Sequence, residues 1–168
     1  GLLVANLTQP SGRYVLLSKV EDSIAVGERE SFLVSHQYPG HFFAGGQLFL
    51  RRFDGENCPK FTYEIDDQSL EKEILMIRGM DSVILKYRIQ KYDSPCILRL
   101  KPFFAYRSIH SLSIENTYFR GDITEIQDGY RMTPYEGMPA MHIQLSSPSR
   151  FLPGGVWYKR FEYAEEKA

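Results

Sequence analysis

The feature that most constrains this chain is the near-regular alternation of apolar and polar residues at Val83–Gln90, where every second side chain is apolar. A period of two is typical of a β-strand with one buried face, because successive side chains point to opposite sides. The neighbouring segments 70–78 and 96–106 show strand patterns too and are rich in β-branched and aromatic residues. Since only short turns, at 79–82 and 91–95, join the three segments, they predict an antiparallel meander.

Short strand patterns separated by turn residues occupy the rest of the chain. Strands are expected at 2–6, 13–20, 23–26, 31–35, 48–53, 61–65, 112–115, 123–127, 130–133, 141–145 and 156–160. We interpret Glu21-Asp22 as a turn and 36–47 as an unusually aromatic loop. This spacing predicts an all-β protein with one domain over residues 1–168, a large antiparallel β-sandwich.

The charge balance argues against two classes of partner. Twenty basic and twenty-one acidic residues leave a net charge of -1, so nothing favours binding to nucleic acid or to an anionic membrane. No apolar run approaches the length of a membrane span, and we expect a soluble, cytoplasmic protein. The two cysteines, Cys58 and Cys96, are too few for a disulfide framework and are expected to be free thiols.

Both ends of the chain suggest a segment of a longer protein. The N-terminus starts inside an apolar run at 1–5, and the C-terminal stretch 162–168 is charged and carries no stop signal. We therefore expect these 168 residues to be a segment of a longer protein.

Strong catalytic motifs are missing from the sequence. It contains no nucleophile elbow, no phosphate-binding loop, no dinucleotide fingerprint and no cysteine–histidine cluster at metal-ligand spacing. His36 and His41 are five residues apart in a Pro-Gly segment, which is poor spacing for a metal pair. Carboxylates at 64–67 and 122–128 could form an acid–base pair, but their turn-like context favours solvated side chains. We predict no catalytic residue, no metal and no cofactor.

A mixture of aromatic rings and polar groups, which suits a sugar, is the more informative pattern. The segment 96–110 begins as a strand and ends with an aromatic, a cation and an imidazole, which indicates either a structural corner or the edge of a site. Sugars offer apolar faces and hydroxyl rims that fit flat rings beside hydrogen-bonding side chains. The candidate residues for substrate binding or for a domain interface are Tyr38, His41, Tyr106, Arg107, His110 and Trp157. The alternative is that such rings fill the core, which we favour for Phe103 and Phe104.

Several ordered blocks of the sequence resemble the N-terminal domain of bacterial and archaeal glycogen debranching enzymes. The blocks are GLLVA at 1–5, GRYVLLSK at 12–19, QYPG at 37–40 and LRLKPFFAYRSIHSL at 98–112. The similarity extends over nearly the whole chain.

The resemblance implies a fold, a role and a set of partners. The fold would be an antiparallel supersandwich of the galactose mutarotase type, preceding an α/α-barrel. The parent enzyme would be an amylo-α-1,6-glucosidase whose catalytic acids lie in that barrel. This domain would then be non-catalytic, with its own C-terminal barrel and a glycogen-like α-glucan as partners, and Arg107 and His110 at the edge that faces the barrel.

Two rival functions remain open at this level. The first is a complete mutarotase-like epimerase, in which His110 or His142 would converge with Glu64 or Glu125. The second is a β-sandwich interaction module whose aromatic surface binds another protein.

Overall fold

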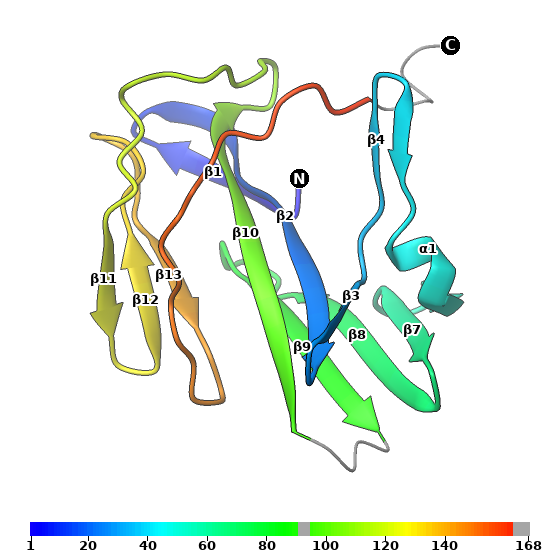
Figure 1. The fold of residues 1–168 in the computed structure, drawn as a ribbon. Coiled ribbons are helices and arrows are strands. Elements are labelled where there is room, and N and C mark those ends of the chain that lie inside the picture. The colour runs from blue at the N-terminus through cyan, green and yellow to red at the C-terminus, as the bar shows by residue number, and fades with distance from the viewer. Residues whose placement is uncertain (91–94, 163–168) are drawn as a thin grey trace. The chain divides into compact units, whose positions relative to one another are not determined.

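The computed structural model describes residues 1–90 and 95–162, and its regular secondary structure consists almost entirely of antiparallel strands (Figure 1). The chain divides into two compact units, and each is described by itself. Unit 1 comprises Gly1–Lys19 and Phe103–Tyr158, and unit 2 comprises Val20–Pro102 with the described residues from Lys159 onward. The all-β antiparallel prediction is confirmed, with one four-residue helix as the exception.

One sheet has the strand order β1-β2-β10, with β3 also paired to β2. Its strands are β1 (Leu3–Thr8), β2 (Ser11–Val26), β3 (Arg29–Phe32) and β10 (Cys96–Ser108). The long strands β2 and β10 each contribute residues to both units. Strand β10 continues through Pro102, a residue that has no backbone N–H. As an edge strand, β10 has a side on which a missing N–H costs little.

The predicted turn at Glu21-Asp22 is wrong, because β2 runs unbroken for 16 residues. Asp22 points into the interior of unit 2, where its Oδ2 lies 2.5 Å from the Nζ of Lys72 and accepts a hydrogen bond of 2.9 Å from the Tyr87 hydroxyl. Glu21 is equally engaged, with its Oε1 2.5 Å from His36 Nε2. Two consecutive acidic residues are typical of a turn, but here each carboxylate interacts with another side chain of the fold.

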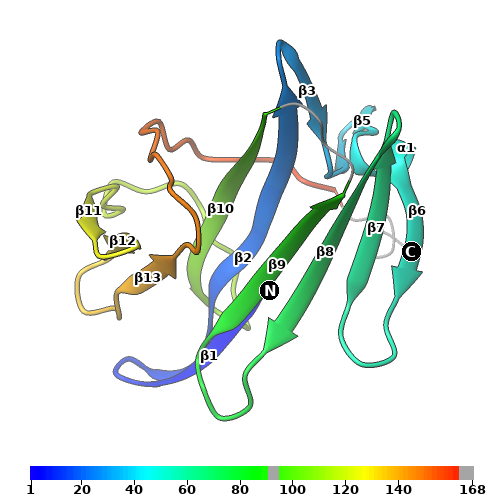
Figure 2. The same cartoon turned by 90° about the horizontal axis from the view of Figure 1, so that it is seen from below.

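Unit 2 contains a second sheet in the order β6-β7-β8-β9, whose four strands lie side by side in Figure 2. The strands are β6 (Leu50–Asp54), β7 (Lys60–Ile65), β8 (Gln68–Met76) and β9 (Val83–Gln90). The predicted alternation in β9 is confirmed, since its odd-numbered side chains are shielded and its even-numbered ones exposed. The predicted meander is wrong in its third strand, because β10 pairs with β2 and not with β9. Positions 91–94 of the predicted turn between them lie outside the described residues.

The core of unit 2 joins β2 and β3 to this four-stranded sheet. Ile24 and Leu33 are buried in one cluster with Tyr63, Ile65 and Leu70. The opposite face of the sheet carries charged pairs across the strands: Lys60 Nζ lies 2.9 Å from Glu73 Oε1, and the register places Glu73 opposite Lys86. One face is therefore a core and the other is polar.

The aromatic segment 36–47 was predicted to be a loop, and this prediction is wrong. It forms a hairpin of β4 (His36–Tyr38) and β5 (His41–Phe43), followed by the helix α1 (Gly46–Phe49). The expected strand at 48–53 is consequently shortened at its start by α1. Gly45 and Gly46 permit this turn, because a Cβ atom at either position would lie within 2.3 Å of a backbone oxygen of Val34 or Leu33.

Unit 1 contains a three-stranded sheet of β11 (Ile123–Ile126), β12 (Gly129–Met132) and β13 (Met141–Gln144). These strands match the expectations for 123–127, 130–133 and 141–145. The strands expected at 112–115 and 156–160 are wrong, since both stretches are irregular. Their alternating residues have no neighbouring strand to pair with in the described structure.

Two smaller observations complete the fold. Cys58 and Cys96 are free, as predicted. Within the described residues, no helix has the length and apolarity required to cross a membrane.

Candidate functional site

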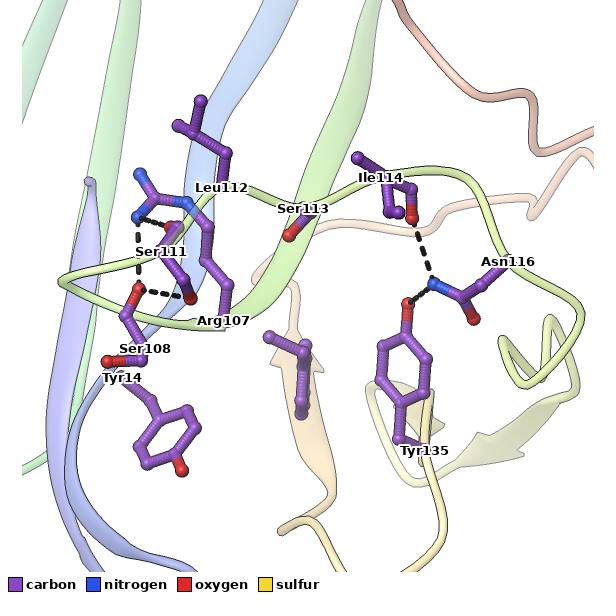
Figure 3. A pocket seen from close by; sticks show the side chains of 10 residues that line it. Tyr14, Arg107, Ser108, Ser111, Leu112, Ser113, Ile114, Asn116 and Tyr135 are labelled. Atoms are coloured by element: carbon purple, nitrogen blue, oxygen red, sulfur yellow. Dashed lines mark hydrogen bonds between the residues drawn. The ribbon is translucent and has the colours of Figure 1, made fainter.

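The candidate site is an open pocket of about 410 Å³ in unit 1, at the end of β10 (Figure 3). Tyrosines, serines, an amide and one guanidinium dominate its walls. The lining residues are Tyr14, Tyr106, Arg107, Ser108, Ser111, Leu112, Ser113, Ile114, Asn116 and Tyr135. Its volume is in the range typical of small-molecule sites, and its only formally charged lining residue is a cation.

Arg107 holds the loop that forms one wall of the pocket. Its Nη1 donates hydrogen bonds to the carbonyl oxygens of Ser108, at 3.1 Å, and Ser111, at 2.7 Å. The turn is closed further by the backbone N–H of Ser111, which donates to the Ser108 oxygen at 3.2 Å. Figure 3 shows the guanidinium folded against this turn. The cation therefore fixes the backbone of the pocket wall.

Tyr106 forms part of the pocket through a strained but well-anchored position. Its φ is 44°, unusual for a residue with a side chain, and its hydroxyl donates to the carbonyl oxygen of Pro139 at 3.1 Å. Burial raises the pKa of Tyr106 to about 12, so the hydroxyl stays neutral at ordinary pH. Its hydroxyl is thus committed to the fold, which leaves mainly the ring for the pocket.

Asn116 and Tyr135 form the opposite wall. Asn116 Nδ2 donates to the Ile114 carbonyl oxygen at 3.0 Å and to the Tyr135 hydroxyl oxygen at 3.3 Å. Ser113 is anchored to the strand, because its hydroxyl donates to the Ala105 carbonyl oxygen at 3.0 Å. Figure 3 shows Tyr14 and Tyr135 on opposite sides of the pocket, below the loop that carries the serines. The loop is thus fastened at both ends.

The six residues predicted for the site occur in both units. Tyr106 and Arg107 line the pocket, whereas His110 is exposed on the adjoining turn and is not a lining residue. Trp157 is half-buried and is not a lining residue; its ring centroid lies 5.7 Å from that of Phe119, which in turn lies 5.8 Å from that of the lining residue Tyr135. Tyr38 and His41 belong to the β4–β5 hairpin of unit 2.

Aromatic rings pack together at the β4–β5 hairpin, and the ring of His36 is one of them. The ring of His36 lies 5.2 Å from that of Phe161, and Tyr38 stacks on Phe161 at 5.4 Å between ring centroids. The backbone N–H of Glu162 donates to the Gln37 carbonyl oxygen at 2.9 Å, which fastens this late segment to β4. Tyr38 is therefore partly used in packing, while His41 is exposed at the hairpin tip.

Unit 2 has a smaller pocket of about 140 Å³ beside the end of β2. Its polar rim is Arg29 and Asp66, whose side chains form an exposed ion pair of 2.7 Å. Its floor is apolar and includes Ile24 and Ile65. A rim whose charges already neutralise each other offers little to a charged ligand.

The candidate carboxylates do not gather into a catalytic pair in either pocket. Glu64 is exposed and accepts a hydrogen bond of 3.1 Å from Arg51. Asp66 and Asp128 lie in tight hairpin turns with φ of 55° and 54°. Among residues 1–90 and 95–162, no group of three or more histidine, cysteine or acidic side chains could hold a metal ion.

The register of the three-stranded sheet also separates Glu125 from His142, one of the acid–imidazole pairs considered for an epimerase. Glu125 is opposite Tyr130, which is opposite Ile143, whereas His142 is opposite Arg131. Because directly paired residues share a face and neighbours alternate, Glu125 and His142 lie on opposite faces. They cannot act together on one sugar.

Sequence reasoning missed most of the polar lining of the pocket. The missed residues are Tyr14, Ser108, Ser111, Ser113, Asn116 and Tyr135. The available signal was the density of serines between 108 and 113 just after a strand, since polar loops at strand ends often carry function. The alternation of these serines with Leu112 and Ile114 was interpreted as a strand instead.

Comparisons with known proteins give one finding. A family model described as glycogen debranching enzyme N terminal matches residues 1–168, the whole chain. Searches of curated proteins and of solved structures found no significant match.

Proposed function

Because this chain belongs to the glycogen debranching enzyme N-terminal family, we propose that it is a non-catalytic β domain that supports the catalytic part of such an enzyme. Under this proposal the catalytic part is an α/α-barrel that follows in the same polypeptide, and the two units form one supersandwich domain. The predicted cytoplasmic location remains part of the proposal.

The observation that carries the support role is a group of exposed apolar side chains in the irregular segment after β10. Leu112 is 87% exposed, and Ile114 and Tyr118 are each 79% exposed. Large apolar side chains on one short segment are a common mark of an interface, because their exposure to water is unfavourable. The backbone of this segment is held by Arg107, Ser113 and Asn116, so the side chains are presented on an ordered loop.

The absence of a catalytic pair is consistent with a supporting domain. Glycoside hydrolysis needs two carboxyl groups on either side of the scissile bond. Among the described residues no carboxylate lines the 410 Å³ pocket; Glu64 pairs with Arg51, and Asp66 and Asp128 lie in turns. We therefore assign the bond-breaking step to the part of the enzyme that carries the acids.

Association of the separate parts tests this proposal. The 168-residue chain is mixed with the remainder of its enzyme, produced separately, and complex formation is followed by analytical ultracentrifugation and by debranching activity. We expect a stable complex and higher activity than the remainder shows alone. Replacing Leu112 and Ile114 by serine should weaken the complex, whereas Met80→Ser, at a similarly exposed apolar residue of unit 2, serves as the control. No association, together with full activity of the remainder alone, would refute the supporting role.

A second function, the binding of α-glucan, is favoured by the composition of the pocket. Its tyrosine rings, hydroxyls and amide are the groups that bind neutral sugars. A domain that both supports the enzyme and binds the polymer would raise the local concentration of substrate. A titration of the chain with maltooligosaccharides tests this role separately from association.

A further inference from the structure

We propose that the unit 1 pocket binds an internal stretch of a linear α-1,4-linked glucan, with Tyr14 as the stacking platform and Arg107, Ser111 and Asn116 as the hydrogen-bonding wall. This inference rests on the proposed function, since the family supplies the class of polymer. It adds the site, the residue roles and the part of the polymer that is recognised.

The polar groups of the pocket suit a ligand that is rich in oxygen acceptors. Of the residues that the structure describes, Arg107 is the one formally charged lining residue, and no carboxylate lines the pocket to attract a cation. The Nη1 of Arg107 already donates to two carbonyl oxygens. The guanidinium therefore offers its remaining N–H groups, on Nη2 and Nε, to ligand oxygens, and an anion would compete with a sugar for them. Sugar hydroxyls accept such bonds without requiring a full charge.

Tyr14 is the ring best placed to stack on a sugar. It is half-buried on β2 and its hydroxyl has no hydrogen-bond partner among the described residues. The hydroxyls of the other two tyrosines are engaged, Tyr106 with Pro139 and Tyr135 with Asn116. Tyr14 thus combines a ring face with an available hydroxyl, the combination that an amphipathic pyranose needs.

The opposite wall is prepared for the hydroxyl rim of the sugar. The Asn116 carboxamide is fixed by Ile114 and Tyr135, and the Ser111 hydroxyl lies on the turn held by Arg107. Groups that are already positioned lose little conformational freedom when a ligand binds. A glucan with its ring plane on Tyr14 would therefore present its hydroxyls to an ordered polar edge.

The open shape of the pocket indicates which part of the polymer fits. A depression that is open to solvent does not enclose a single sugar, so a chain bound in it can extend beyond the pocket. We therefore expect affinity to rise with chain length. Leu112 and Ile114 of the exposed apolar segment line the pocket, so the bound chain would pass beside the proposed interface.

Nuclear magnetic resonance titration of the 168-residue chain tests the proposal. The probes are glucose, maltoheptaose, the β-linked cellohexaose and inorganic phosphate. We expect maltoheptaose to shift the signals of residues 107–116 and to bind at least about tenfold more tightly than glucose, a difference of about 1.4 kcal/mol. Cellohexaose and phosphate should bind at least about tenfold more weakly than maltoheptaose. Saturation by phosphate at lower concentration would overturn the assignment to a neutral sugar.

Matched variants separate stacking from folding. Tyr14→Phe keeps the ring and removes the available hydroxyl, so it should lose only about threefold in maltoheptaose affinity, whereas Tyr14→Leu should lose about tenfold. Tyr118→Ala, an exposed tyrosine outside the pocket, should leave affinity unchanged. Each variant is checked by thermal unfolding, and Asn116→Ala replaces Tyr14→Leu if that variant does not fold. Equal binding by all variants, or no shift with any glucan while the complex with the catalytic part still forms, would refute the pocket and leave the supporting role intact.

Discussion

Asp22 and Lys72 form a buried ion pair in unit 2, with Oδ2 and Nζ 2.5 Å apart and the Asp22 side chain completely shielded from solvent. Tyr87 donates a second hydrogen bond to the same carboxylate oxygen, and burial next to this anion raises the pKa of the Tyr87 hydroxyl. The pair links β2 to β8 through the interior. A buried charge without its partner is costly, whereas a complete pair is close to neutral in net stability.

Removing one member of the pair should therefore destabilise the chain strongly. Lys72→Met leaves Asp22 buried without its cation, and we expect a loss of about 3–5 kcal/mol in the free energy of unfolding. Asp22→Leu should destabilise the chain to a similar extent, because it leaves Lys72 buried without its anion. Urea unfolding of the two single variants and the double variant measures this, and the double variant should be more stable than either single one. Additive losses in the double variant would show that the two charges are not coupled.

The pair also illustrates what sequence reasoning could and could not predict. Lys72 shares a face with Leu70 and Ile74 in an otherwise apolar pattern, which was a sign of a buried charge. Asp22, however, was assigned to a turn because its partner is fifty residues away in the sequence. Local periodicity defines strands, but it does not identify which distant side chain neutralises a buried charge.

The same limit explains the errors in sheet topology and in the pocket. The strand at Val83–Gln90 was predicted with its bounds, because alternation is a property of the segment alone. The pairing of β10 with β2 was not predicted, because pairing depends on which other strand is available. In the pocket, Arg107 was singled out as a cation after a strand, but its bonds to backbone oxygens depend on the path of the following turn.

The second prediction concerns Glu30 on β3. A hydrogen bond of 2.5 Å from the Ser23 hydroxyl, assisted by Arg99, holds the pKa of the Glu30 carboxyl below its usual value. A lowered pKa in the folded state contributes stability above the unfolded pKa, which is lost as the pH falls through the folded value. Ser23→Ala should raise the pKa of Glu30, and the free energy of unfolding should then fall less as the pH is lowered. Carbon-detected titration of the carboxyl signals measures the shift, and Ser18→Ala, an exposed serine on the same strand, should leave it unchanged.

The third prediction concerns the close approach of Gly46 to Leu33, the residue that directly follows β3. A Cβ atom there would lie 2.2 Å from the Leu33 carbonyl oxygen, so Gly46→Ala must displace backbone. We expect a loss of about 1–3 kcal/mol, the usual cost of overpacking. Gly155→Ala is the control, because nothing lies within 4 Å of the added atom. Equal unfolding midpoints for the two variants would show that the start of α1 can shift without cost.

The last prediction tests the anchoring of Tyr106 below the pocket. Burial raises the pKa of this tyrosine to about 12, while an unfolded chain has the ordinary value of about 10. A raised pKa means that the stabilising contribution is complete below about pH 10 and is lost as the pH rises toward about 12. Tyr106→Phe removes this titration and also the hydrogen bond to Pro139, so the variant should be less stable by about 1 kcal/mol at neutral pH. It should then lose less further stability than the parent chain in alkali. Urea unfolding at neutral and alkaline pH compares the two losses. An identical alkaline loss would mean that the Tyr106 hydroxyl ionises as readily in the folded chain as in water, contrary to its burial beside the pocket.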